Sequence, residues 1–220
     1  MREVFRAGGI EQHYGKHRIL RGCSVYAAPG ECVGIAGRNG SGKSTLLSVL
    51  AGVSKPEKGT LTYGETDLFK HPGLITKIVG YVPQTNPLIG ELRASDNLRL
   101  LGGSADPEDP VIVSLGLSKL LKRKTSKLSG GMRRRLAIAC ALTEHPPVLI
   151  MDEPTSAMDL YHKAVIYDYL AAFRSDGGIV IVSTHEVEEM EFCDRLYLLS
   201  GGCTEESTPA DAARIIKGEG

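Results

Sequence analysis

The nine residues Gly37-Arg38-Asn39-Gly40-Ser41-Gly42-Lys43-Ser44-Thr45 decide the fold of this chain. They fit the pattern G-x-x-x-x-G-K-[ST], in which a glycine-rich turn exposes backbone N–H groups ahead of a lysine. The apolar run 32–36 before them has the character of a strand, and the run 46–51 after them has that of a helix. A strand, this loop and a helix in that order predict that residues 37–45 hold the phosphates of a nucleotide.

Two side chains of this loop have chemistry of their own. Lys43 is expected to neutralise the β- and γ-phosphates, and the Ser44 hydroxyl is expected to ligate Mg²⁺. The helix that begins near Gly42 adds the positive end of its dipole at the same point. The alternative is a chance glycine-rich turn. The match at all four fixed positions, in the right strand and helix context, disfavours that alternative.

A pair of carboxylates ends a second apolar strand. Val148-Leu149-Ile150-Met151 is followed directly by Asp152 and Glu153, and parallel sheets bind their ligands at the carboxyl ends of strands. Asp152 is expected on the metal side, where it complements Ser44. Glu153 is expected to face the terminal phosphate, where a carboxylate can orient and deprotonate an attacking water. The alternative is a solvated acidic strand end.

A second candidate anion site lies at Leu128-Ser129-Gly130-Gly131-Met132, just before a predicted helix. Ser129 suits the N-cap position, and the two glycines leave backbone N–H groups bare. Capping alone explains Ser129, but it does not explain two adjacent glycines, because glycine weakens the start of a helix. The segment therefore indicates a second helix N-terminus that binds an anion.

The stretch 128–132 resembles the signature of the ATP-binding-cassette (ABC) ATPases, which is usually LSGGQ, and it continues as RRRLAIACAL, similar to the family's basic and then apolar helix. The resemblance runs over nearly the whole chain. It implies that Tyr14 stacks on adenine, and that Gln84 joins the core to a helical insert and senses Mg²⁺ and water. It also implies that Asp159, in the segment SAMD, belongs to the family's D-loop, and that the switch residue His185 contacts the γ-phosphate.

Taken singly, these later landmarks have plainer explanations. Tyr14 would be an aromatic on a strand face, Gln84 a solvated loop residue, and His185 a helix cap or surface residue. Their order around a phosphate loop and a carboxylate pair favours the functional interpretation. The consecutive Arg133, Arg134 and Arg135 are interpreted, for at least one of them, as a solvated helix face, because neighbouring residues on a helix point in different directions.

Three positions depart from the family pattern. Met132 replaces the glutamine of the signature, Cys140 stands where the family often has arginine, and Met158 replaces the D-loop leucine. None of them changes Lys43 or the carboxylates, so active ATP hydrolysis is expected. Methionine at position 132 resembles the ATPase subunits of drug, polysaccharide or haem-pathway exporters.

The fold class expected is α/β: a phosphate-loop NTPase core with a mainly parallel sheet, an N-terminal antiparallel β subdomain and an inserted helical subdomain. Residues 1–220 are expected to form one ABC ATPase domain with the insert at about 85–130. Short strands are predicted within 2–36, and a hairpin over 59–68. Further strands are predicted over 78–83, 148–151, 179–182 and 196–199. Helices are predicted over 94–101, 111–121, 130–144, 160–173 and 187–192, and from Thr208-Pro209 onward.

The charge balance and the hydropathy of the sequence limit the classes of partner that this protein is expected to have. The 26 Lys and Arg balance 26 Asp and Glu, so no nucleic-acid partner is expected. The basic cluster at 119–127 is interpreted as a solvated loop or helix end, with a polyanion site as the alternative. No uncharged apolar run approaches the length that spans a bilayer, so no transmembrane segment is expected and a separate permease chain must supply the crossing.

The resemblance implies an ATP-hydrolysing subunit of an ABC transporter, with ATP and Mg²⁺ as cofactors. It implies a head-to-tail dimer with a second copy or a paralogous ATPase subunit, and a transmembrane permease docked near residues 84–88. The protein is then cytoplasmic and peripheral on the inner face of the cell membrane. Two alternatives stay open: a soluble ABC ATPase of DNA repair or translation, and an unrelated phosphate-loop kinase.

Overall fold

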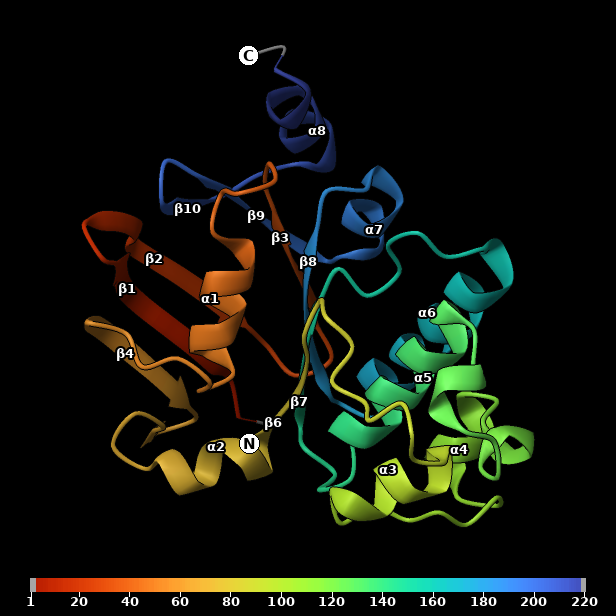
Figure 1. Ribbon diagram of the computed structural model, residues 1–220. Helices are drawn as coiled ribbons and strands as arrows, with labels where there is room; N and C mark the ends of the chain where they lie inside the picture. Colours follow the sequence, from red (N-terminus) through yellow and green to blue (C-terminus); the bar gives the residue numbers. More distant parts are fainter. Residues whose placement is uncertain (1–2, 219–220) are drawn as a thin grey trace.

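The computed structural model describes residues 3–218, and its centre is a six-stranded sheet in the order β10-β9-β3-β8-β7-β6 (Figure 1). Five of the strands are parallel and β10 pairs antiparallel with β9 at one edge. The strands are β3 (Cys32–Ala36), β6 (Val79–Val82), β7 (Val148–Asp152), β8 (Ile179–Thr184), β9 (Arg195–Ser200) and β10 (Cys203–Glu206). All residues of β3, β7 and β8 are buried, as expected for parallel strands covered on both faces.

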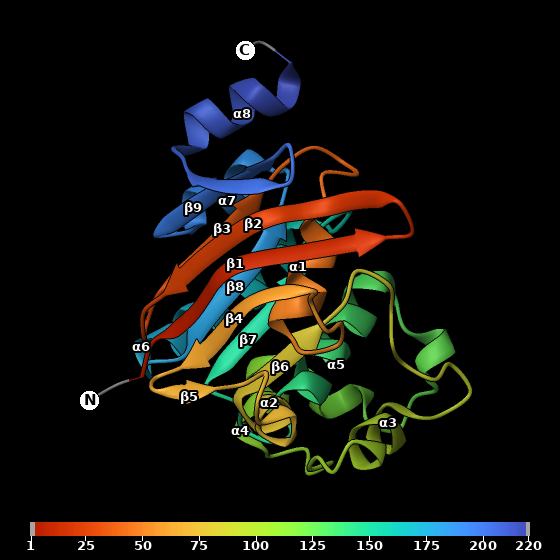
Figure 2. The same cartoon turned by 90° about the vertical axis from the view of Figure 1, so that its left-hand side faces the viewer.

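A second, four-stranded antiparallel sheet lies beside the first in the order β2-β1-β4-β5 (Figure 2). It consists of β1 (Phe5–Tyr14), β2 (His17–Ala27), β4 (Lys58–Tyr63) and β5 (Thr66–Asp67). Of the short strands predicted within 2–36, β3 has five residues, but β1 and β2 are longer than expected, at ten and eleven residues. The Gly8-Gly9 turn signal is absorbed as a shift of register within β1, where Gly9 has φ 60°.

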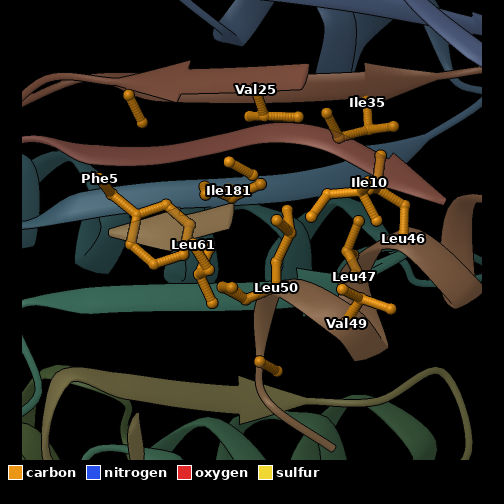
Figure 3. Close-up of a cluster of buried hydrophobic side chains, with 14 of the residues drawn as sticks. Phe5, Ile10, Val25, Ile35, Leu46, Leu47, Val49, Leu50, Leu61 and Ile181 are labelled. Atoms are coloured by element: carbon orange, nitrogen blue, oxygen red, sulfur yellow. The ribbon is translucent and has the colours of Figure 1, made fainter. Parts of the chain in front are cut away.

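Helix α1 (Lys43–Leu50) fills the space between the two sheets (Figures 1 and 3). Its Leu46, Leu47 and Leu50 are fully buried, and they pack with Ile10 and Leu61 of the small sheet and with strands of the large one. At roughly 25 cal/mol per Å² of apolar surface, side chains of this size contribute about 1.5–3 kcal/mol each when fully buried. This packing fixes the direction of α1, and therefore the place of the loop before it.

Residues 85–128 carry short helices: α3 (Ala94–Leu100), α4 (Pro110–Ser114) and the 3₁₀ turns η1 (Ser118–Leu120) and η2 (Thr125–Lys127). The expected single helix over 111–121 is divided between α4 and η1, because Gly116 has φ 62° and ends the helical geometry. Helices α5 (Gly130–Ala141) and α6 (Leu160–Ser175) lie next to this group (Figure 1). Its leucines share one buried cluster with α5, α6 and the large sheet.

Several boundaries differ from those predicted. Helix α5 ends at Ala141 rather than near 144, and His145 takes a left-handed φ of 51° just before Pro146. Helix α2 (Pro72–Ile78) and strand β10 were not predicted. Helices α7 (Val187–Phe192) and α8 (Pro209–Lys217) confirm the prediction, and the Thr208 side chain caps α8. None of the helices within 3–218 combines the length and the apolarity that crossing a bilayer requires.

Candidate nucleotide site

The phosphate loop joins β3 to α1 and curls around the amino end of that helix. Gly40 and Gly42 have φ values of 80° and 105°, which a residue with a side chain rarely adopts. A Cβ at Gly37 would lie 2.6 Å from the Ser41 hydroxyl and 2.8 Å from a backbone oxygen, so this position also needs glycine. The loop lines a cavity of about 380 Å³ together with Ser44, Thr45 and residues of other elements.

The loop is chemically suited to an anion. Lys43 is only 5% exposed, and its ammonium donates to two uncharged carbonyls, those of Gly37 at 2.9 Å and Arg38 at 3.2 Å. Burial lowers the pKa of Lys43, while Glu153 and Asp152 oppose that shift. The buried Ser41 hydroxyl has no hydrogen-bond partner within residues 3–218. A cation held by neutral carbonyls and an unsatisfied hydroxyl fit the phosphate oxygens of a nucleotide.

The two predicted carboxylates stand at the carboxyl end of β7. Asp152 is 2% exposed, and its Oδ1 accepts a hydrogen bond from the buried Ser183 hydroxyl of β8. The Glu153 backbone N–H donates to the same hydroxyl at 3.0 Å. Glu153 has φ 49°, a left-handed conformation that is costly for a residue with a side chain and that often marks functional sites.

Three of the predicted side chains meet at one point. Gln84 Nε2 donates to Glu153 Oε2 at 3.0 Å, and His185 Nδ1 lies 3.3 Å from Glu153 Oε1. Gln84 follows β6, Glu153 follows β7 and His185 follows β8, so three adjacent parallel strands deliver them to the same edge of the sheet. Gln84 and Glu153 also line the phosphate-loop cavity with Lys43.

The segment 129–131 lies at the start of α5, and none of its residues lines the phosphate-loop cavity. Ser129 caps the helix by accepting from the backbone N–H of Met132 at 3.2 Å, as predicted. Gly130 and Gly131 line a different cavity, of about 340 Å³, which shares Gln84 and Glu153 with the first. A Cβ on Gly131 would lie 1.7 Å from Cδ2 of His162, so the buried imidazole of α6 occupies the place of a side chain there.

Other predicted residues lie farther from this centre. Tyr14 ends β1 and is 52% exposed, and it does not line the phosphate-loop cavity. The exposed Asp159 caps α6 through the backbone N–H of His162 at 2.9 Å. The Arg38 side chain turns to the last helix and donates to the Ile216 carbonyl at 3.0 Å, while its own carbonyl accepts from Lys43.

The arginines after the glycine pair were misjudged. None of the three is exposed, and all donate to backbone carbonyls: Arg133 to Leu128, Arg135 to Leu115, and Arg134 to three carbonyls around Gln84 and Glu153. The expectation of a solvated face was therefore wrong. A run of arginines beside glycines was the available signal, but nothing in the sequence shows which carbonyls they reach.

A buried link between the carboxylate loop and α7 was also missed. Glu189 of α7 is 3% exposed, and its Oε1 accepts from both the N–H and the hydroxyl of Thr155. Thr155 lies two residues after Glu153, and α7 begins two residues after His185. The pair therefore connects the loops that carry these two side chains.

Comparison with known proteins places this geometry in a family. A family model described as ABC transporter matches residues 20–156. The Nod factor export ATP-binding protein I of Bradyrhizobium diazoefficiens is 37% identical over 204 residues, which are 89% of this chain and 67% of that protein. The linearmycin resistance ATP-binding protein LnrL of Bacillus subtilis is 34% identical over 208 residues, 90% of this chain and 67% of that protein. The chain belongs to the ABC transporter family, and the relatives that it matches are ATP-binding proteins.

The fold has the same relatives among solved structures. An ATP-binding subunit of an ABC transporter superposes with a TM-score of 0.83 at 24% identity, over 97% of this chain and 93% of the other. A bacterial ABC transporter cassette solved as a dimer gives 0.79 at 28% identity, over 93% and 98%. The chain spans 64% of the length of a further relative, the Nod factor export ATP-binding protein I of Rhizobium etli, to which it is 35% identical over 202 residues, 88% of this chain.

Proposed function

We propose that this protein binds and hydrolyses ATP and that it couples hydrolysis to transport through a separate membrane permease. The observation that carries the proposal is that Gln84 and His185 both contact Glu153, and that Gln84 and Glu153 line the same cavity as Lys43. A buried cation beside a carboxylate held by an amide and an imidazole suits cleavage of a terminal phosphate by water.

The roles follow from position. Residues 37–45 hold the phosphates, with Lys43 as the neutralising charge. Glu153 accepts the proton of the attacking water, and Gln84 and His185 keep its two oxygens pointed into the cavity. Mg²⁺ would be held by Ser44, Gln84 and Asp152, and would neutralise charge on the phosphate oxygens. Tyr14 is proposed as the platform for the adenine ring, since its exposed ring is free to receive it.

The separation of the two phosphate-binding segments supports a dimer. Ser129, Gly130 and Gly131 do not line the phosphate-loop cavity of their own chain. A second copy or a paralogous subunit, placed head to tail, would bring its residues 129–131 and Asp159 to the ATP held by residues 37–45. ATP then joins the subunits, and its hydrolysis releases them. The dimeric structure of a related cassette supports dimer formation by analogy.

Export is the proposed direction, and the inner face of the cell membrane the proposed location. The named relatives are an export protein and a resistance protein, and Met132 points the same way. The exposed Ile89 and the nearby segment 84–88 are the proposed contact with the permease. A phosphate-loop kinase is an outcome of the test below, and failure to co-purify with a membrane permease would indicate a soluble ABC ATPase.

Acceptor-free ATP hydrolysis tests the enzymatic claim. The purified protein should release phosphate from Mg-ATP without an added acceptor, and Glu153→Gln should slow this by about 10²–10⁴-fold while keeping ATP affinity, since it removes only the base. Asp168→Asn, which replaces an exposed carboxylate of α6 by a neutral amide, is the control for the loss of one negative charge. Phosphate transfer only to an added acceptor would indicate a kinase, and unchanged turnover in Glu153→Gln would remove Glu153 from the mechanism.

A further inference from the structure

Arg134 makes three hydrogen bonds that reach out of its own helix. Its Nη1 donates to the carbonyl of Pro83 at 2.5 Å, its Nη2 to the carbonyl of Asp152, and its Nε to the carbonyl of Pro154 at 3.2 Å. Pro83 directly precedes Gln84 in the chain, and Asp152 and Pro154 stand on either side of Glu153. One guanidinium therefore holds the main chain next to both side chains.

The neighbouring arginines do something different. Arg133 Nη1 donates to the Leu128 carbonyl at 2.7 Å, just before its own helix. Arg135 Nη1 donates to the Leu115 carbonyl at 2.7 Å, and its guanidinium lies over the Tyr161 ring. Neither bonds to the loops that follow β6 and β7. Position 134 is thus distinguished from its neighbours by what it reaches rather than by its charge.

The contacts of Arg134 depend on the rigid, planar shape of its guanidinium group. All three acceptors are uncharged backbone carbonyls, although Arg134 lies close enough to Asp152 to feel its charge. Burial lowers the pKa of Arg134 to about 10, so the group stays charged at neutral pH. A planar guanidinium can donate in several fixed directions at once, whereas a lysine ammonium is a single point on a flexible stem.

The backbone at Glu153 needs such a restraint. Its φ of 49° is unfavourable for a residue with a side chain, and such a conformation persists only where the surroundings hold it. Ser183 holds its N–H from β8. The carbonyls before and after it are held by Arg134, which stands on α5, the helix that begins with the glycine pair.

We propose that Arg134 is a positioning residue for ATP hydrolysis, which fixes Gln84 and Glu153 against each other and ties their alignment to the position of helix α5. The inference rests on the proposed ATPase function. Movement of α5 relative to the sheet then changes the Gln84 and Glu153 loops directly, without any contact between the arginine and the nucleotide.

The same substitution at adjacent positions tests this proposal. Arg134→Lys keeps the charge, but one ammonium nitrogen cannot reach the three carbonyls that three guanidinium nitrogens bind. The kcat for ATP hydrolysis should therefore fall by up to about 100-fold, the size of effect expected when a reacting group is misplaced. The Kd for ATP should stay within about twofold, because the phosphate loop is untouched. Arg133→Lys can still reach its single carbonyl, and should leave both quantities near wild type. Equal kcat in the two variants would overturn the proposal.

A double-mutant cycle separates positioning from a general loss of stability. If Arg134 acts through Glu153, Arg134→Lys should have little further effect on single-turnover hydrolysis in a Glu153→Gln background. Fully multiplicative losses would show that it acts elsewhere. Inactive wild-type protein would instead contradict the ATPase function itself.

Amide hydrogen exchange gives a readout that does not depend on turnover. In nucleotide-free protein, the Glu153 N–H should exchange faster in Arg134→Lys than in wild type, while Arg133→Lys should show no change. Arg134→Gln serves as a second variant should Arg134→Lys fold poorly, since an amide can reach one carbonyl. Unchanged exchange at Glu153 in every folded Arg134 variant would refute the restraint.

Discussion

Glu189 carries a buried carboxylate whose protonation affects stability. Burial raises the pKa of Glu189 above its ordinary value of 4.5, and the hydrogen bonds from Thr155 oppose this shift only in part. The folded state therefore keeps the proton to higher pH than the unfolded state does. The stability that this group contributes is fully present below 4.5 and is lost as pH rises through the raised pKa.

Glu189→Gln should remove this pH dependence. The amide keeps an acceptor for the Thr155 N–H and hydroxyl and never ionises. Denaturant unfolding from about pH 4 to about pH 8 should show the variant gaining on wild type as pH rises, because only wild type must ionise a buried group. The exposed Glu188→Gln on the same helix is the control. A constant difference between wild type and Glu189→Gln across this range would contradict the account.

Single residues differ in how well the sequence reveals them. Lys43, Asp152 and Glu153 could be placed because a fixed spacing and two apolar strands bring them to one sheet edge. The sequence could not reveal the role of Arg134, because its partners are backbone carbonyls of other elements. It could not reveal the pair of Thr155 and Glu189 either, because these residues lie far apart along the chain. The adenine contact of Tyr14 stays a prediction.

At the scale of elements, the two glycines at the start of α5 have different structural roles. Gly131 faces the His162 ring of α6, and an added Cβ there would collide, whereas a Cβ on Gly130 would meet no atom within 4 Å. Gly131 is therefore a contact point between two helices. Gly130 leaves the helix N-terminus open.

The paired substitutions Gly131→Ala and Gly130→Ala should separate these roles. Overpacking should lower the free energy of unfolding of Gly131→Ala by about 1–3 kcal/mol. Gly130→Ala should be neutral or stabilising by up to about 1 kcal/mol, because alanine favours the helix. Adding His162→Ala to Gly131→Ala should recover part of the loss. Equal unfolding energies for the two alanine variants would show that the helix contact is not as described.

Elements with a strong period or a fully apolar run were predictable. The strands β3, β7 and β8, the helix α7 and the cap of α8 agree with their predictions. The length of β1 was not predictable, because a glycine pair usually indicates a turn. In the sheet, the strand instead continues through this pair with a shift of register. The helix over 111–121 was also misjudged, since Gly116 breaks a run whose apolar pattern continues past it.

On the scale of the whole molecule, the two segments predicted to bind phosphate, residues 37–45 and 129–131, do not share one cavity. The phosphate loop lines one cavity, and Gly130 and Gly131 line another. The antiparallel sheet and α1 position the first, and the leucine cluster under α5 positions the second. In the proposed dimer, residues 129–131 of a second subunit complete the site.

Position 130 is the place to test that requirement. A charged residue at Gly131 would collide with His162 inside its own subunit, so its effect would be ambiguous. A Cβ at Gly130 would meet no atom within 4 Å, and an acidic residue in the first turn of a helix is favourable to the fold. The added carboxylate should nevertheless repel the terminal phosphate of ATP bound to a partner.

The mass of the protein in solution, measured by light scattering with Mg-ATP, tests the central claim most directly. Glu153→Gln binds ATP without consuming it, so it should be a dimer with Mg-ATP and a monomer with Mg-ADP. Adding Gly130→Asp to that variant should leave the Kd for ATP unchanged in the monomer and abolish the dimer. A Glu153→Gln protein that stays monomeric when saturated with Mg-ATP, or a Gly130→Asp double variant that still dimerises, would contradict the account.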